Sequence, residues 1–418
     1  MAHAQPVHRC GKSAEILTRS RCIQRAIKRG PIADQQAQRS WRHIRRNSSR
    51  KLYRVRRLLP AVDICFESYG ITGMHDARGE QTNAVERGCP VSGQRIHMQI
   101  DALNRLRSGV AQEVEIQISH CGVCHSDLHL IANDWGISQF PFIPGHEIIG
   151  KVTTVGSEVK SLTVGQRVGV GWQSNSCGLC EWCSQGMENL CAAAEATCVH
   201  RHGGYADSIR VNARFAVPVP DSLASENAAP LLCGGITVYN PLRIHGINPS
   251  SRVGIVGIGG LGHIALQFAR VFGAEVTAFS TSAAKEEEAR ALGAHHFVNT
   301  RETKAMREVA GSFDFILSTI NADQDWMSYV HALRPTGTLC FVGVPPSPVT
   351  VHAFPLISGV RTITGSPIGS PYRLREMLDV AARHGVKAQT EAFPMQKANE
   401  AIEKVKKNKV RYRAVLAN

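Results

Sequence analysis

Four closely spaced cysteines are the residues in this 418-residue chain whose types and spacing most clearly indicate chemistry. They are Cys177, Cys180, Cys183 and Cys191, in the pattern C-x2-C-x2-C-x7-C. Four thiolates at this spacing can close a tetrahedron around one zinc ion, and the two-residue gaps suit one ion better than two strained disulfides. Because a four-thiolate site has no open coordination position, we expect this zinc to brace a loop and the reaction to take place elsewhere.

A second, scattered set of residues has the types needed for a reactive zinc site. Cys121 and Cys124 lie in Cys-Gly-Val-Cys-His-Ser-Asp, His146 lies in Gly-His-Glu, and Cys233 follows far downstream in Leu-Leu-Cys-Gly-Gly. One of the first two cysteines, the histidine and the distant cysteine supply three protein ligands and leave one position open. Zinc bound in this way can polarise a carbonyl group so that its carbon accepts a hydride.

A glycine-rich turn later in the chain indicates where the hydride donor binds. A β-branched run at 252–258 leads into G-x-G-G-x-G and then into apolar residues at helical spacing, and residues 275–279 supply the next strand. Such a strand-turn-helix-strand unit holds a pyrophosphate at the helix N-terminus. The residues that we expect to bind the cofactor in this turn are Gly257, Gly259, Gly260, Leu261 and Gly262.

The residues after that second strand distinguish between the two nicotinamide dinucleotides. NAD sites usually have Asp or Glu here to accept hydrogen bonds from the ribose 2′-hydroxyl, whereas this chain has Ser280, Thr281, Ser282 and then Lys285. Three hydroxyl groups and one ammonium group suit a 2′-phosphate. We therefore predict NADP(H), the alternative being that these residues form a solvated turn and helix start.

Together these motifs resemble the zinc-dependent medium-chain alcohol dehydrogenase family over about residues 113–416. The segments at 124–127, 145–147, 231–237 and 257–263 are similar to the cinnamyl-alcohol-dehydrogenase branch, and most similar to its bacterial NADPH-dependent aldehyde reductases. The resemblance implies that Cys124, His146 and Cys233 hold a catalytic zinc ion, with Cys121 a buried neighbour. Two zinc ions per chain are therefore expected, one catalytic and one structural.

The resemblance also implies roles for residues around the catalytic zinc. Asp127 is expected to hold the histidine ligand through its other ring nitrogen, and Glu147 either approaches the metal or remains an outer carboxylate. Ser126 is expected to pass a proton to or from the substrate oxygen, with His129 as the outer end of the relay or as a surface histidine without a role. Trp135 is expected to lie against the body of the aldehyde, although a purely structural tryptophan is the alternative.

The expected fold class is α/β, with a β-rich, GroES-like zinc catalytic domain and a Rossmann domain built on a doubly wound parallel sheet. Val114, Ile116 and Ile118 alternate with polar residues as in a half-buried strand, and strand-like runs at 313–317 and 337–342 extend the α/β pattern towards six strands. We expect a catalytic domain at 113–236, an NADP-binding domain at 237–369 and a return to the catalytic domain at 370–418.

The formal charge of +14 is concentrated at the start of the chain. Residues 1–112 contain 21 Lys and Arg against 8 Asp and Glu, a net +13, so the remainder carries only +1. This atypical basic segment is interpreted as a targeting arm, a nucleic-acid-binding tail or a mis-assigned start, and the last is favoured because it has no aromatic interleaving and no recognisable binding module. Strands that normally precede residue 113 in the family are not apparent in it.

The predicted activity is reduction of aromatic or medium-chain aliphatic aldehydes by a homodimer that uses NADP(H) and zinc. One alternative is an NADP-dependent polyol or alcohol oxidiser, and another is a catalytically weak zinc-binding protein whose Arg-rich arm contacts nucleic acid. No apolar run approaches the roughly 20 residues needed to span a bilayer. Thirteen cysteines without a secretory signal pattern indicate a reducing compartment, so we expect the cytoplasm.

Overall fold

The computed structural model describes residues 111–418. The interpretation of the basic N-terminal segment therefore falls almost entirely outside the described residues. All described residues belong to one compact unit of the chain. Within 111–418, no helix combines the length and the apolar character that crossing a membrane requires.

The first of two large sheets in the described fold has seven strands. Its strands are β1 (Glu113–Val123), β2 (Ile148–Val155), β3 (Arg167–Val170), β6 (Ser208–Asn212), β7 (Ala216–Pro218), β14 (Thr390–Pro394) and β15 (Arg413–Ala417). They are ordered β14-β15-β1-β2-β3-β7, with β6 also paired to β1. The predicted alternation in β1 is confirmed, because Val114, Ile116 and Ile118 are buried while their neighbours are more exposed.

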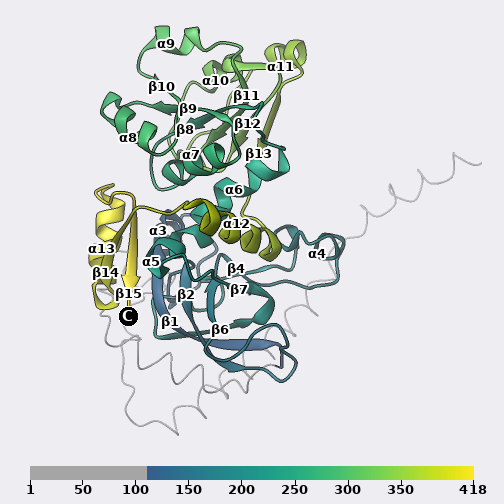
Figure 1. The fold of residues 1–418 in the computed structure, drawn as a ribbon, viewed down its shortest axis with the longest axis vertical. Helices are drawn as coiled ribbons and strands as arrows, with labels where there is room; N and C mark the ends of the chain where they lie inside the picture. Colours follow the sequence, from purple (N-terminus) through teal and green to yellow (C-terminus); the bar gives the residue numbers. More distant parts are fainter. Residues whose placement is uncertain (1–110) are drawn as a thin grey trace, which may run out of the picture. The chain divides into compact units, whose positions relative to one another are not determined.

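The end of the chain lies beside its first described strand. β15 pairs antiparallel with β1, with Ala417 opposite His120 and Ala414 opposite Val123, and Figure 1 shows the yellow C-terminal strand next to the blue β1. This pairing carries Arg413 into the interior, where its side chain is buried. Residues separated by about 290 positions in the sequence are thus brought together around the end of β1.

Six parallel strands form the second sheet. They are β8 (Arg252–Val256), β9 (Glu275–Ser280), β10 (His296–Asn299), β11 (Phe313–Ser318), β12 (Leu333–Phe341) and β13 (Thr362–Gly365). Their order β10-β9-β8-β11-β12-β13 places the first strand in the middle, as in a doubly wound dinucleotide-binding sheet. The Rossmann prediction and its six strands are confirmed.

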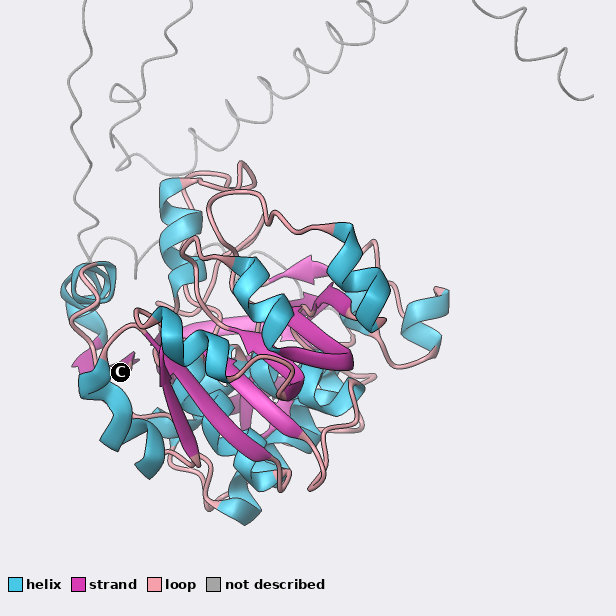
Figure 2. Cartoon of the chain, turned by 90° about the horizontal axis from the view of Figure 1, so that it is seen from above, coloured by secondary structure: helices cyan, strands magenta, loops and turns pink. Residues whose placement is uncertain are grey.

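Helices cover both faces of this second sheet, as Figure 2 shows. Successive residues of β11 belong to different apolar clusters, since Phe315 and Leu317 pack with α7 (Gly262–Val271) and Ile316 packs with α10 (Trp326–Ala332). The near-continuous apolar runs that the sequence contains are therefore explained by a sheet buried on both sides.

The remaining elements are short or connect the two sheets. The helices are α3 (His125–Ala132), α4 (Glu181–Ser184), α5 (Ser225–Ala228), α6 (Gly234–Ile244), α8 (Glu286–Ala291), α9 (Thr303–Glu308), α11 (Ala353–Gly359), α12 (Pro371–His384) and α13 (Ala398–Lys406). The strands β4 (Gln173–Asn175) and β5 (Glu195–Ala196) form a small hairpin-like pair that flanks the four-cysteine loop.

Candidate active site

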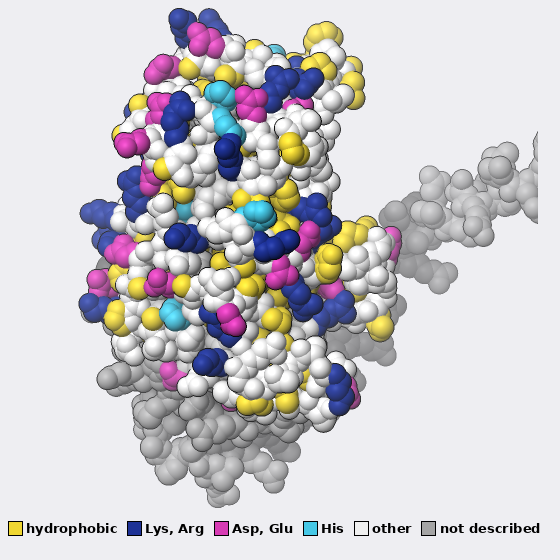
Figure 3. Space-filling view, viewed as in Figure 1, with side chains coloured by type: hydrophobic (Ala, Val, Ile, Leu, Met, Phe, Trp, Pro, Cys, Tyr) yellow, Lys and Arg dark blue, Asp and Glu magenta, His cyan; other side chains and the backbone are white. Residues whose placement is uncertain are grey.

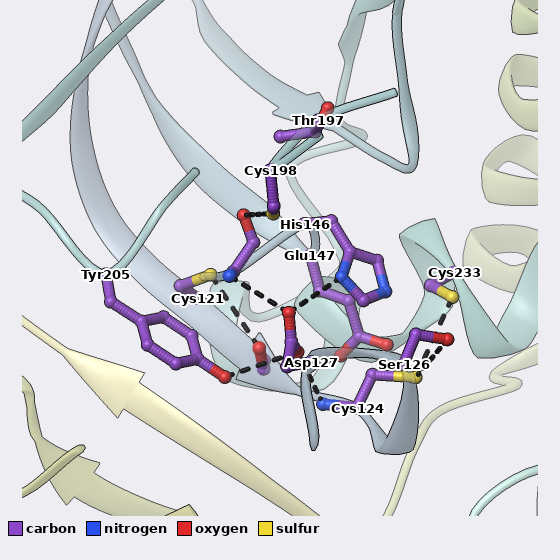
Figure 4. A network of polar contacts seen from close by, with 12 residues as sticks. Cys121, Cys124, Ser126, Asp127, His146, Glu147, Thr197, Cys198, Tyr205 and Cys233 are labelled. Carbon is purple, nitrogen blue, oxygen red and sulfur yellow. Dashed lines mark hydrogen bonds and ion pairs between the residues drawn. The ribbon is translucent and has the colours of Figure 1, made fainter. Parts of the chain in front are cut away.

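Three chain segments bring four ligand-type side chains together. Cys124 lies between β1 and α3, His146 and Glu147 directly precede β2, and Cys233 precedes α6. Each offers one atom within 4.8 Å of the others, and all four are buried. The Sγ atoms of Cys124 and Cys233 are 4.0 Å apart, and Figure 4 shows both sulfurs and the His146 ring converging.

The imidazole of His146 is oriented by one nitrogen and leaves the other without a protein partner. Its Nδ1 lies 2.9 Å from Oδ1 of Asp127, whereas Nε2 is buried and has no hydrogen-bond partner in the described part of the chain. Buried polar atoms are nearly always satisfied. An unpartnered imidazole nitrogen beside two thiol sulfurs is a donor set that zinc would satisfy, so these residues fit the metal.

Asp127 fixes the positions of both neighbouring segments. Its carboxylate accepts hydrogen bonds from the backbone N–H of Cys124 at 2.9 Å, from the backbone N–H of Gly145 at 2.9 Å and from the Tyr205 hydroxyl at 3.2 Å. The contact with His146 was expected from the sequence. Tyr205 was missed, because it lies 78 residues away and no local pattern connects it to Asp127.

The electrostatics of the cluster favour the thiolate form of Cys124. The neighbouring Cys233 thiol, helped by the nearby His146 ring and the positive charge of Arg413, outweighs burial and lowers the pKa of Cys124 well below its usual value. Burial alone would lower the pKa of His146, but Asp127 outweighs it and raises that pKa. A deprotonated cysteine is the form that binds metal.

Glu147 forms a buried ion pair with Arg413, a residue that the sequence reasoning missed. Arg413 Nη2 donates to Glu147 Oε1, while Oε2 has no partner among the described residues. Burial raises the pKa of Glu147 to about 7, and Arg413 opposes this rise. A Cβ added at Gly260 would lie 3.2 Å from Arg413 Nη1, so this guanidinium lies between the metal cluster and the dinucleotide loop.

Close packing around Glu147 explains one glycine of the first motif. A Cβ at Gly122 would lie 1.9 Å from Glu147 Oε2, so any larger residue would displace this buried carboxylate. The cysteine-rich motif at the end of β1 therefore includes a glycine because the carboxylate passes directly over its backbone.

The predicted relay residues lie on the outer side of the cluster. Ser126 Oγ is 3.7 Å from Cys124 Sγ, and His129 Nδ1 is 2.7 Å from Asp134 Oδ2. No direct hydrogen bond joins Ser126 to His129 in residues 111–418. Their side chains are therefore near the same site without forming a continuous protein relay.

A line of aromatic rings connects His146 to the surface. Trp172 meets His146 edge-on at 5.0 Å, Trp135 meets Trp172 edge-on at 6.1 Å, and His129 stacks on Trp135 at 5.1 Å. Trp135 is 41% exposed, so part of this side chain is accessible from solvent. The structure brings the predicted Trp135 near the site and adds Trp172, which the sequence reasoning did not identify.

The glycine-rich turn has the geometry that a dinucleotide requires. Gly257 adopts φ +90°, and a Cβ at Gly262 would lie 1.8 Å from the Gly257 carbonyl oxygen, so the strand and α7 approach too closely for any other residue. Gly259, Gly260 and Leu261 complete the turn before α7.

The residues predicted to bind a 2′-phosphate lie at the end of β9. Ser280 ends that strand and accepts a hydrogen bond from the backbone N–H of Ser282 at 3.2 Å, and Thr281 between them is exposed. The ammonium group of Lys285 reaches back and donates to the Ile258 carbonyl in the glycine-rich turn. The strand end and the turn are therefore physically connected through Lys285.

The four-cysteine loop gathers its sulfurs at a second place. The four Sγ atoms of Cys177, Cys180, Cys183 and Cys191 lie within 4.8 Å of one another, with separations of 3.9 Å (Cys177–Cys183) and 3.5 Å (Cys177–Cys191). Zinc–sulfur bonds of about 2.3 Å give a tetrahedron with edges of about 3.8 Å, so these positions fit one zinc ion. Backbone N–H groups of Leu179 and Cys180 lower the pKa of Cys177 to about 6, which favours the ligating thiolate.

Three other cysteines are buried outside the four-cysteine loop. Cys121 and Cys340 are completely buried, and Cys198 donates from Sγ to the Gly145 carbonyl at 3.1 Å. Cys198 also lies within 4.8 Å of ligand atoms of Asp127 and His146. Cys198 contacts the segment that carries His146, but it is not part of the ligand cluster that contains Cys124 and Cys233.

Known families match both halves of the described fold. Residues 110–221 match the alcohol dehydrogenase GroES-like domain, and residues 260–383 match the zinc-binding dehydrogenase domain. The chain is 45% identical over 308 residues to a Synechocystis protein named aldehyde reductase AdhA. That alignment covers 74% of this chain and 92% of the relative.

Two solved structures share the fold at substantial identity. A cinnamyl alcohol dehydrogenase from Sorghum bicolor has a TM-score of 0.72 and 39% identity, covering 74% of this chain and 91% of that chain. CAD from Helicobacter pylori, solved with NADP(H), has a TM-score of 0.69 and 32% identity, covering 74% and 92%. With relatives of this identity and coverage, the chain belongs to the zinc-binding alcohol dehydrogenase family and is an oxidoreductase.

Proposed function

We propose that this chain interconverts aldehydes and primary alcohols with NADP(H), and that it reduces aromatic or medium-chain aliphatic aldehydes. The observation that carries the proposal is the buried, unpartnered Nε2 of His146 beside Cys124 and Cys233, with Arg413 extending from this cluster to the glycine-rich turn. Arg413 contacts both the metal cluster and the dinucleotide turn. This arrangement suits hydride transfer between a bound dinucleotide and a substrate at the metal site.

Cys124, His146 and Cys233 would hold the catalytic zinc, and the four-cysteine loop would hold a second, structural ion. When bound, the catalytic ion supplies Lewis-acid polarisation of a carbonyl group. Asp127 positions the imidazole and both backbone segments that carry ligands. Glu147, held by Arg413, supplies an ionisable carboxyl group with one oxygen directed into the same cluster.

Ser126 would donate or accept the proton at the substrate oxygen, and His129 would exchange protons with solvent. Ser126 is part-buried beside Cys124, and His129 is partly exposed and paired with Asp134. A hydroxyl group near the ligands and an imidazole near solvent have the chemistry that a two-step proton exchange needs.

The cofactor would be NADP(H), bound through the turn at 257–262 and through Ser280, Thr281, Ser282 and Lys285. The described strand end carries hydroxyl groups and one ammonium group where an NAD site usually has a carboxylate. The similar Helicobacter pylori enzyme binds NADP(H), which supports this choice.

The body of the aldehyde would contact Trp135 and Trp172. These rings lie between His146 and the surface, and indole faces provide apolar area for aryl or alkyl groups. The names of the relatives from Synechocystis and Sorghum bicolor, an aldehyde reductase and a cinnamyl alcohol dehydrogenase, support an aldehyde or primary alcohol as substrate.

The proposed organisation has a catalytic domain at 113–236, a cofactor domain at 237–369 and a return at 370–418, in a homodimer. Strand β13 is an edge of the parallel sheet, and apolar side chains near it are exposed. Figure 3 shows yellow apolar side chains on the surface at the position of α11 in Figure 1. These exposed residues are Val344, Phe354, Ile357 and Val360. A second copy would cover them.

None of the nine described cysteines forms a disulfide, which supports a reducing compartment, for which we propose the cytoplasm.

The test is oxidation of NADPH by the purified, zinc-loaded 418-residue chain with cinnamaldehyde, benzaldehyde and hexanal, with NADH in parallel. His146→Ala should abolish turnover, whereas the exposed His384→Ala should retain it. Mannitol with NADP+ tests the polyol alternative. Absence of turnover with every aldehyde and both cofactors, in a chain that retains zinc, would contradict the proposed function.

A further inference from the structure

The guanidinium of Arg411 lies on the cofactor side of the fold, although it comes from the last segment of the chain. We propose that Arg411 is a second cation for the 2′-phosphate of NADP(H), acting beside Lys285. This inference rests on the proposed use of NADP(H). It assigns a cofactor-specificity role to a residue outside the dinucleotide motif.

The ring of Tyr412 gathers both cations. Lys285 Nζ lies 5.7 Å from the ring centroid and the guanidinium carbon of Arg411 lies 5.6 Å from it. The same ring stacks on His263, with centroids 4.7 Å apart and planes inclined by 18°. Since His263 belongs to α7, which begins in the glycine-rich turn, the ring holds Arg411 against the cofactor-binding half of the fold.

Glu288 fixes the side chain of Arg411 in this position. Arg411 Nε donates to Glu288 Oε1 at 3.1 Å, and both Arg411 Nη2 and the Tyr412 hydroxyl donate to Oε2. Glu288 lies in α8, three residues after Lys285. The carboxylate therefore anchors the arginine beside the helix that follows the predicted phosphate-binding residues.

The hydrogen-bonding capacity that remains suits a phosphate. The Nη1 group of Arg411 makes no hydrogen bond in the described part of the chain, and the Arg411 side chain is 62% exposed. Lys285 Nζ makes one hydrogen bond, to Ile258, and an ammonium group has three donors. Both cations can thus offer donors to an anion without losing the contacts that hold them.

The charge balance also favours a dianion between these residues. Lys285 and Arg411 together carry two positive charges, against one negative charge on Glu288. Burial, followed by repulsion from Arg411, lowers the pKa of Lys285, and the negative charge of Glu288 offsets this effect only in part. A phosphate monoester, with a charge near −2, would relieve that repulsion. The ribose 2′-hydroxyl of NADH has no charge with which to do so.

The experiment compares binding of 2′,5′-ADP and 5′-ADP to the full, zinc-loaded chain by titration calorimetry at low and moderate salt. The two probes differ by the 2′-phosphate alone. Arg411→Gln should weaken 2′,5′-ADP about tenfold and reduce the salt dependence of its binding, while 5′-ADP changes by less than about twofold. Arg411→Lys should restore part of the loss.

A matched control is Arg383→Gln, which removes an exposed arginine on α12 whose Nε donates to the Asp379 carbonyl in the same helix. It should leave both probes unchanged. Equal weakening of both probes by Arg411→Gln, or an unchanged ratio, would overturn the inference. If the unmodified chain binds both probes equally, both the proposed use of NADP(H) and this inference are wrong. If the unmodified chain prefers 2′,5′-ADP and Arg411→Gln keeps that preference, only this inference is wrong.

Discussion

Oδ1 of Asp127 lies 2.9 Å from Nδ1 of His146 in a completely buried environment. Because that bond occupies one ring nitrogen, the other nitrogen is directed towards the sulfurs of Cys124 and Cys233. The same carboxylate holds the backbone of Cys124. One side chain thus determines the positions of two of the three proposed zinc ligands.

We expect Asp127→Asn to weaken binding of the catalytic zinc by about 10- to 100-fold, because an amide oxygen cannot replace a carboxylate that accepts four hydrogen bonds. Competition with a chromophoric chelator measures this loss. Tyr205→Phe removes a single hydrogen bond to Asp127 and should cost less than about tenfold. Unchanged zinc affinity in Asp127→Asn would show that the carboxylate does not organise the ligands.

We expect Cys183→Ser to reduce the zinc content from two ions to one and to lower the melting temperature by about 5 °C, because the loop loses its brace. Metal analysis and thermal unfolding provide the two measurements. Cys340→Ala, at a buried thiol outside both clusters, should retain two ions. Two ions in Cys183→Ser would contradict a four-thiolate site.

The Glu147–Arg413 pair should show strong coupling in a double-mutant cycle. Glu147→Gln leaves a buried guanidinium without its counter-charge and should reduce the free energy of unfolding by about 3–5 kcal/mol. Arg413→Met should cost less, since burial already favours protonation of Glu147. The double variant should recover much of the loss, as measured by urea unfolding of the zinc-loaded protein. Additive effects would mean that the two groups do not stabilise each other.

The proposed dimer gives a prediction about the apolar surface near β13. Ile357→Glu places a charge among side chains that a second copy would cover, so we expect monomers in sedimentation velocity experiments. Val164→Glu changes an exposed apolar residue in the turn before β3, in the other sheet's half of the fold, and should leave the assembly unchanged. A dimer that persists in Ile357→Glu would place the interface elsewhere.

The sequence was informative where the signal is local. The alternation in β1 and the glycines before α7 follow from backbone geometry over a few residues, so strand and turn could both be predicted. Arg413 and Tyr205 carry no such signal, because pairing of β15 with β1 and folding of a distant loop bring them to the site. A single sequence does not record which distant residues such contacts join.

His263 provides a prediction about stability in acid. Its Nε2 accepts a hydrogen bond from the Gln389 backbone N–H at 3.1 Å, so Nδ1 carries the proton and donates to the Gly259 carbonyl at 2.9 Å. A second proton would destroy the bond to Gln389. Burial lowers the pKa of this histidine to about 4, against about 6.5 in the unfolded chain.

The sign follows from which state binds protons first. As pH falls from 6.5 to 4, the unfolded chain protonates this histidine and the folded chain does not, so folding loses roughly 3 kcal/mol across that window. Urea unfolding at pH 7 and pH 4.5 should therefore show a smaller pH dependence for His263→Asn than for the unmodified protein. His384→Asn, at an exposed histidine on α12, should keep the full dependence. Parallel pH profiles for His263→Asn and the unmodified protein would mean that this imidazole is not the group that is held neutral.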